Sequence, residues 1–233
     1  MFATVLFAIF AKHCVSKCSV NTACSNTVFD LQISKRSHFD ESSFAVFVSS
    51  YILNQIAPNG VLSDLGQHCI AGLIHHHEAL AGLLAVTVNS YDRLAAGSLA
   101  GYWANWAEDH RLVTTRCSTG SSKSARLEHR MADCATSPYQ AVAAVLQAAR
   151  LGVAGSMPLQ PAEDLDGLEN VRERRHIPSG LDKSLEALDK DVMLRQAVGE
   201  AYCDGLLYLK RDEFKRLLNK SVDEIRDFYL PFV

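Results

Sequence analysis

The fold of this chain is decided by the stretch Ser124-Ala125-Arg126-Leu127-Glu128-His129-Arg130-Met131-Ala132-Asp133. Side chains on a β-strand alternate between two faces, so Arg126, Glu128 and Arg130 are predicted to share one face, with the intervening residues on the other. A row of arginine, carboxylate and arginine favours a bound phosphate, an anionic substrate or a divalent cation. Such alternation is also typical of a solvated strand at the edge of a sheet, and this alternative stays open for the row taken alone.

Other motifs flank this stretch in a fixed order. They are Asn89-Ser90-Tyr91-Asp92-Arg93-Leu94, then Arg111 and Arg116, and, after the stretch, Ser137-Pro138-Tyr139. The patterns at 112–116 and 125–131 each predict a strand, and the residues between them are typical of a loop. A hairpin of these two strands would bring Arg116 close to Arg126.

Helical signals dominate the rest of the chain after residue 57. Ser63 or Asp64 caps a predicted helix that runs to about Leu84. Its consecutive histidines, His75-His76-His77, point about 100° apart, so they cannot share one metal ion, and we expect a polar helix face there. Further predicted elements are a strand at 103–106, a helix at 138–151 with Ser137 as cap and Gly152 after its end, a helix at about 191–219, a short helix from Ser221, and an apolar ending that docks back on the domain.

The composition is that of a globular protein. The chain has 233 residues and a net charge of −3, which gives no sign of a general nucleic-acid binder. Its seven cysteines, an odd number without paired metal spacing, favour free thiols in a reducing cytoplasm, with a zinc site at His13, Cys14 and Cys18 as the alternative. The apolar run Phe2–Ala11 is too short to span a bilayer and follows no basic residue. We therefore expect a buried or accessory segment there, with a signal for export as the alternative. For the protein we expect a cytoplasmic location and no membrane partner.

The ordered motifs resemble the C-terminal part of the glutamine synthetase catalytic domain. The resemblance runs from about Ala57 to Val233 and includes, in order, the quoted motifs from Asn89 to Tyr139. It implies an α+β fold, in which a partial catalytic domain has an antiparallel sheet packed with helices and a helical C-terminal region. Residues 1–56 carry no recognisable family motif, so we predict an N-terminal segment at 1–56 and the catalytic-domain part at 57–233.

The resemblance also implies roles for individual residues. Arg93 and Arg130 match arginines that bind glutamate, and Arg130 also lies at the acyl phosphate. Arg111 matches the arginine that steadies the transferring phosphoryl group, so Arg111 and Arg130 are the expected catalytic residues. Arg116 and Arg126 match arginines at the ATP phosphates, and Glu128 matches a ligand of an active-site Mg or Mn ion. Any one of these residues, taken alone, could instead form a surface salt bridge.

Three departures from the family pattern bear on function. Leu99 stands where ammonia-using members carry a glutamate, and a leucine can neither hold a cation nor accept a proton. This favours the branch that ligates glutamate to larger amines, for which Trp103 and Trp106 either line a pocket or serve as core aromatics. Residues 1–56 show neither the N-terminal β-grasp domain nor the metal-binding glutamates and His-x-His segment of complete members. The stretch 163–178 contains no tyrosine, so the nucleotidylation site of some bacterial members is absent.

The resemblance implies an ATP-dependent ligase that joins glutamate to ammonia or an amine through a γ-glutamyl phosphate, with ATP and Mg or Mn as cofactors. We expect a truncated catalytic domain that does not perform the reaction unaided, because Glu128 alone cannot hold the metal ions. Two alternatives remain: a catalytically inactive module that binds nucleotide or glutamate, and an assembly partner of a full-length homolog. A homo-oligomer or such a hetero-assembly is expected, with no nucleic acid.

Overall fold

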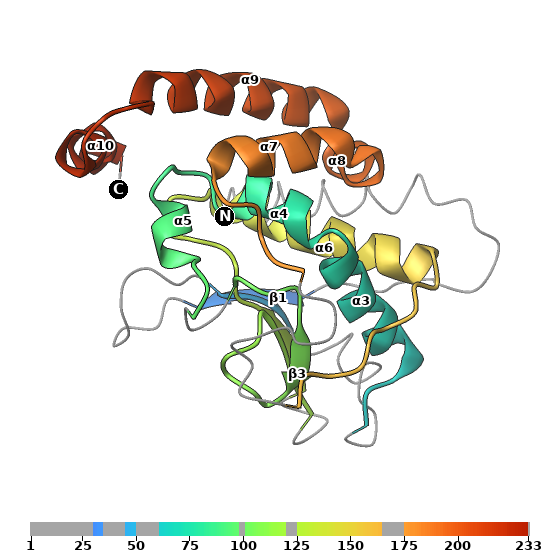
Figure 1. The fold of residues 1–233 in the computed structure, drawn as a ribbon. Coiled ribbons are helices and arrows are strands. Elements are labelled where there is room, and N and C mark those ends of the chain that lie inside the picture. The colour runs from blue at the N-terminus through green and yellow to red at the C-terminus, as the bar shows by residue number, and fades with distance from the viewer. Residues whose placement is uncertain are drawn as a thin grey trace.

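The computed structural model describes residues 30–34, 45–49, 61–97, 101–119, 125–164 and 175–232. These residues form one mixed sheet covered by helices (Figure 1). The strands are β1 (Asp30–Ser34), β2 (Ala45–Ser49), β3 (Trp106–Glu108), β4 (Thr115–Ser118) and β5 (Arg126–His129). The helices are α3 (Asp64–His75), α4 (His77–Leu84), α5 (Ser90–Arg93), α6 (Pro138–Ala154), α7 (Leu181–Lys190), α8 (Val192–Val198), α9 (Glu200–Leu217) and α10 (Val222–Tyr229), followed by the 3-10 turn η1 (Leu230–Phe232).

The sheet has the strand order β1-β2-β5-β4-β3. The predicted hairpin is confirmed, because β4 pairs with β5 in antiparallel fashion and Arg116 lies directly opposite Glu128. The sheet is not wholly antiparallel as expected, since β3 runs parallel to β4. Asp109, directly after β3, has a φ of 45°, and its backbone amide donates a hydrogen bond to the Cys117 carbonyl of β4. Strands β1 and β2 precede residue 57, yet they join the same sheet because β2 pairs with β5. The predicted domain boundary between residues 56 and 57 stays a prediction.

The predicted strand at 103–106 is displaced toward the C-terminus. Trp106 is the first residue of β3, whereas Trp103 forms only an isolated bridge with His176. The indole Nε1 of Trp106 donates a hydrogen bond to the Gln160 carbonyl, and its ring belongs to the hydrophobic core. These contacts support the interpretation of Trp106 as a core aromatic residue.

The helix predicted from Ser63 to Leu84 is divided at His76. Ser63 caps its start as expected, since the Ser63 hydroxyl accepts a hydrogen bond from the Gly66 amide. The expectation of a polar face at the histidines is wrong for two of them, because His76 and His77 are buried. The Nδ1 of His76 lies 2.5 Å from a carboxylate oxygen of Asp191 at the start of α8, so burial is compensated by a long-range partner.

Helices α3 and α6 cross in close contact at two glycines. A β-carbon at Gly72 would lie 2.2 Å from the Ala148 carbonyl oxygen, and one at Gly152 would lie 2.1 Å from the His68 carbonyl oxygen. Gly152 was expected to follow the end of its helix, but α6 continues to Ala154. The residue is a glycine because the backbone of α3 approaches it, and not because the helix stops there.

The C-terminal helices form further layers on the side away from the sheet (Figure 1). Helix α7 packs on α4, and α9 packs on α7 and α8. The expected helix at 191–219 is interrupted at Gly199, whose φ of 122° favours glycine. Of the apolar ending, Tyr229 docks as expected: it is buried, and its hydroxyl donates to Glu213 and accepts from the Val88 amide, whereas Leu230 is exposed. None of the described helices has the length and apolar character needed to cross a membrane.

Candidate functional site

An arginine–glutamate–arginine cluster lies on one face of β4 and β5. The Nη2 of Arg116 is 3.2 Å from Oε2 of Glu128, and the Nε of Arg130 is 3.2 Å from Oε1. Arg116 and Glu128 point to the same face because they are direct cross-strand partners. The backbone amide of Arg130 donates to the Thr114 carbonyl, which holds that residue beside β4 just beyond the end of β5. The sequence predicts Glu128 between Arg126 and Arg130. The structure pairs Glu128 with Arg130 as expected, and its other arginine partner is Arg116 of the neighbouring strand.

The cluster carries more positive than negative charge and keeps a buried donor. Two guanidinium groups surround a single carboxylate, and the Glu128 residue is only 8% exposed. The Nε–H of Arg116 is buried and has no hydrogen-bond partner within the part of the chain that the structure describes. A buried donor without a partner costs free energy, and an anion oxygen would relieve that cost. The donor set therefore fits a phosphate or a carboxylate.

Arg126 lies two cross-strand pairs farther along the same two strands, beyond the Cys117–Leu127 pair. It is opposite Ser118, and the alternation of β5 places it on the face that carries Glu128. The side chain is half-buried. Arg116 and Arg126 therefore lie on paired strands, as expected. The ion-paired cluster, however, consists of Arg116, Glu128 and Arg130.

Arg93 is positioned by a polar network that the sequence motifs did not reveal. Its Nη2 donates to the Met131 carbonyl, directly after Arg130. The hydroxyl of Ser90 donates to one carboxylate oxygen of Asp133, whose other oxygen accepts hydrogen bonds from the Ala135 and Thr136 amides. Ser90 and Asp133 lie within the two quoted motifs, but their partnership is long-range in sequence. The network joins the Arg93 segment to the chain that leaves β5.

The structure does not bring every expected residue into the cluster. Arg111 lies exposed in the connection between β3 and β4, outside the contact formed by Arg116, Glu128 and Arg130. Leu99 lies outside the described residues, as do Cys14 and Cys18 of the zinc alternative. The four cysteines within the described ranges, Cys69, Cys117, Cys134 and Cys203, are free thiols.

The opposite face of the same two strands carries a buried hydrogen bond. Thr115 and His129 are direct cross-strand partners, and the hydroxyl of Thr115 lies 3.0 Å from Nδ1 of His129. Burial lowers the pKa of His129 to about 3, with a smaller contribution from neighbouring His77. The Nε2 of His77 donates to the Tyr102 carbonyl at 3.0 Å, and burial lowers the pKa of His77 to about 4. Both rings are thus neutral at pH 7.

A divalent cation does not fit the described residues by themselves. Among these residues no three histidine, cysteine, aspartate or glutamate side chains gather as they would around a metal ion. Glu128 offers one carboxylate, and both of its oxygens face arginines. Because Mg²⁺ and Mn²⁺ take several oxygen ligands, Glu128 could supply only one of those needed.

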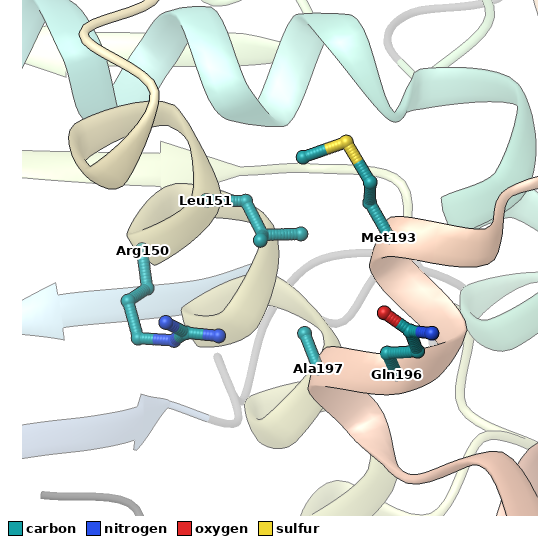
Figure 2. Close-up of a pocket in the computed structure, with 5 residues that line it drawn as sticks. All are labelled: Arg150, Leu151, Met193, Gln196 and Ala197. Carbon is teal, nitrogen blue, oxygen red and sulfur yellow. The ribbon is translucent and has the colours of Figure 1, made fainter. Parts of the chain in front are cut away.

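A separate shallow pocket of about 240 Å³ lies between α6 and α8. Figure 2 shows Arg150 and Leu151 on α6 facing Met193, Gln196 and Ala197 on α8. None of these residues belongs to the sheet, so the pocket is distinct from the arginine–glutamate–arginine cluster.

Comparisons with known proteins identify the family of this chain. The family model described as glutamine synthetase, catalytic domain, matches residues 20–229. The chain belongs to the glutamine synthetase family. It is 33% identical over 153 residues to the glutamine synthetase of Pyrococcus woesei, a match that covers 63% of this chain and 35% of that protein. It is 36% identical over 182 residues to the glutamate–methylamine ligase of Methyloversatilis universalis, covering 73% of this chain and 40% of that protein.

Solved structures give the same family fold. A crystal structure of a glutamine synthase homolog matches with a TM-score of 0.66 and 28% identity, covering 82% of this chain and 45% of that one. Ligand-free GmaS matches with a TM-score of 0.66, 84% of this chain and 46% of that one, and at 24% identity it supports the fold alone. The chain thus spans less than half the length of these relatives. The glutamine synthetase family match begins at residue 20, so it includes β1 and β2.

Proposed function

We propose that this chain carries the phosphate- and glutamate-binding part of a glutamine synthetase-type ligase, which joins glutamate to ammonia or an amine with ATP. In this reaction the side-chain carboxylate of glutamate attacks the γ-phosphorus of ATP and ADP leaves. The amine then attacks the acyl carbon of the γ-glutamyl phosphate, and inorganic phosphate leaves with the bonding electron pair. The observation that carries the proposal is the arginine–glutamate–arginine cluster with its buried Arg116 donor.

The proposed roles follow from charge and position. Both steps develop negative charge on phosphoryl oxygens, and fixed guanidinium groups stabilise such charge. Arg116 and Arg126 would bind the ATP phosphates, because both lie on the cluster face of β4 and β5. Arg130 would bind glutamate and the acyl phosphate, with Arg93 beside it at Met131. Exposed Arg111 would approach the transferring phosphoryl group only once that group is bound.

The proposed metal role of Glu128 requires ligands beyond the described residues. A divalent ion supplies charge neutralisation between the two reacting anions. The described residues offer such an ion a single carboxylate flanked by two arginines. The chemistry of the cluster itself is anion binding.

The acceptor is proposed to be an amine in preference to ammonia. Leu99 replaces the glutamate that ammonia-using members carry, and a leucine can neither attract ammonium nor take its proton.

Nucleotide binding tests the proposal directly. Calorimetry on the purified chain should detect ATP but little adenosine, because the cluster recognises phosphate oxygens. Arg126→Ala should weaken ATP binding by about tenfold or more, as expected for the loss of a charge-assisted contact. Arg150→Ala, in the α6–α8 pocket, is the matched control and should leave ATP binding unchanged. Equal binding of ATP and adenosine, or equal effects of the two substitutions, would count against the assignment.

A further inference from the structure

The Thr115–His129 hydrogen bond lies directly behind the arginine–glutamate–arginine cluster. Thr115 and Arg116 are consecutive on β4, and His129 lies between Glu128 and Arg130. The adjacent cross-strand pairs Thr115–His129 and Arg116–Glu128 therefore point to opposite faces of the same hairpin. A displacement of one pair moves the other, because both use the same two short strands.

Hydrophobic patterning alone leaves the alignment of this hairpin ambiguous. A slip of one residue would bring the charged face into the core and is excluded by burial. A slip of two residues keeps every side chain on its own face, so burial does not exclude it. It would place Arg116 opposite another arginine, either Arg126 or Arg130, and would abolish the pairing with Glu128.

The buried pair exists only in the observed alignment. A slip of two residues would place Thr115 opposite Leu127 or Met131, neither of which offers a hydrogen-bonding group. Thr115 and His129 are 1% and 2% exposed, so water could not replace the lost partner. The Arg116–Glu128 ion pair on the other face cannot fix the alignment of the strands alone, because an anion that binds Arg116 would compete with Glu128.

We propose that His129, through its hydrogen bond to Thr115, is a positioning residue that fixes the β4–β5 alignment and so keeps Arg116 and Glu128 in place for the anion. Its effect reaches the ligand through Thr115 and the strand backbone. The inference rests on the proposed function for its binding readout but has a second readout that needs no ligand. A displacement of about 1 Å in a binding group can cost about a hundredfold in activity, so the alignment of β4 and β5 affects function.

Side-chain variants separate positioning from simple stability. His129→Leu removes the ring nitrogens, whereas His129→Asn keeps a polar group near the position of Nδ1. Thr115→Val removes the partner hydroxyl. Leu127→Val is the control, since Leu127 is buried on the same face of the same strand but contributes no polar group. All variants are compared at a temperature at which circular dichroism shows each of them to be folded.

The first readout is the affinity for ATP in calorimetry. His129→Leu and Thr115→Val should each lose about tenfold or more, and the double variant should be no worse than either, because both remove the same bond. His129→Asn should recover most of the affinity. A loss of equal size in Leu127→Val, or none in His129→Leu, would overturn the inference.

The second readout is amide hydrogen exchange in β4 and β5 without any ligand. Exchange should accelerate in His129→Leu at the amides that pair these strands, and His129→Asn should restore protection. Unchanged protection in His129→Leu would overturn the inference even if ATP binds. If the parent protein binds no ATP but His129→Leu still accelerates exchange and His129→Asn restores protection, the proposed function fails and the positioning role stands.

Discussion

Arg116 and Glu128 face each other across β4 and β5, with Nη2 of the arginine 3.2 Å from Oε2 of the glutamate. Arg130 approaches the other carboxylate oxygen at the same distance. The carboxylate therefore holds two arginines together while it also offsets part of their charge. Ligand binding at this face must depend on the balance between these two effects.

Removal of the Glu128 charge should strengthen the binding of anions in the absence of metal. Glu128→Gln leaves two guanidinium groups without a compensating carboxylate, and a charge change at this range is worth about 1 kcal/mol in a partly solvated site. We expect the affinity for ATP or pyrophosphate, measured by calorimetry in the presence of a chelator, to rise by about fivefold. Glu108→Gln, an exposed glutamate on β3, is the charge-matched control. An unchanged or lower affinity in Glu128→Gln would show that the carboxylate orients the arginines more than it neutralises them.

The sequence predicted local features of the site well, because they depend on neighbouring residues. Alternation along residues 126–130 was sufficient to place Glu128 beside arginines on one face. The Ser90–Asp133 and His76–Asp191 contacts could not be predicted, since each joins residues distant in the chain. His76 and His77 appeared suited to a polar helix face, but long-range partners make their burial tolerable. Gly152 resembled a helix end because the sequence does not reveal which helix crosses it.

The glycine contact between α3 and α6 should be intolerant of substitution. Gly72→Ala places a methyl group 2.2 Å from the Ala148 carbonyl oxygen, so the two helices must separate. We expect a loss of about 3 kcal/mol or more in the free energy of unfolding, measured by chemical denaturation. Gly205→Ala is the control within α9, where an added β-carbon meets nothing within 4 Å. That change should stabilise the protein by about 0.5–1 kcal/mol, so similar effects of the two substitutions would contradict the close contact.

Stability should fall on mild acidification because of buried His77. Burial lowers its pKa from 6.5 to about 4, so the folded protein holds the neutral ring while the unfolded chain takes up a proton. The free energy of unfolding should therefore fall as the pH drops from about 6.5 toward 4, by about 1.4 kcal/mol per pH unit for this group. Denaturation curves between about pH 7 and pH 5 should show a smaller slope in His77→Gln than in the parent chain. Parallel curves would mean that His77 is protonated in the folded state.

The final prediction concerns turnover by the chain on its own. We expect no measurable release of ADP that depends on both glutamate and an amine. Phosphoryl transfer between two anions needs divalent cations to offset their repulsion, and the described residues offer Glu128 as one ligand. Arg111, the expected partner of the transferring group, is exposed and takes no part in the ion pairs of the cluster. Binding of ATP without turnover is therefore the combination that we expect.

The assay supplies Mg or Mn, ATP and glutamate with either ammonium or a panel of monoamines and polyamines. Robust turnover that Glu128→Ala abolishes would show that residues outside the described ranges complete the metal site. Turnover that Glu128→Ala leaves intact would instead remove the metal role from this residue. The choice of amine is informative in its own right, because we propose that Leu99 replaces the group that would hold ammonium and deprotonate it. Turnover with larger amines but not with ammonium would place this chain with the amine ligases, whereas turnover with ammonium alone would show that another group performs the task of the missing glutamate.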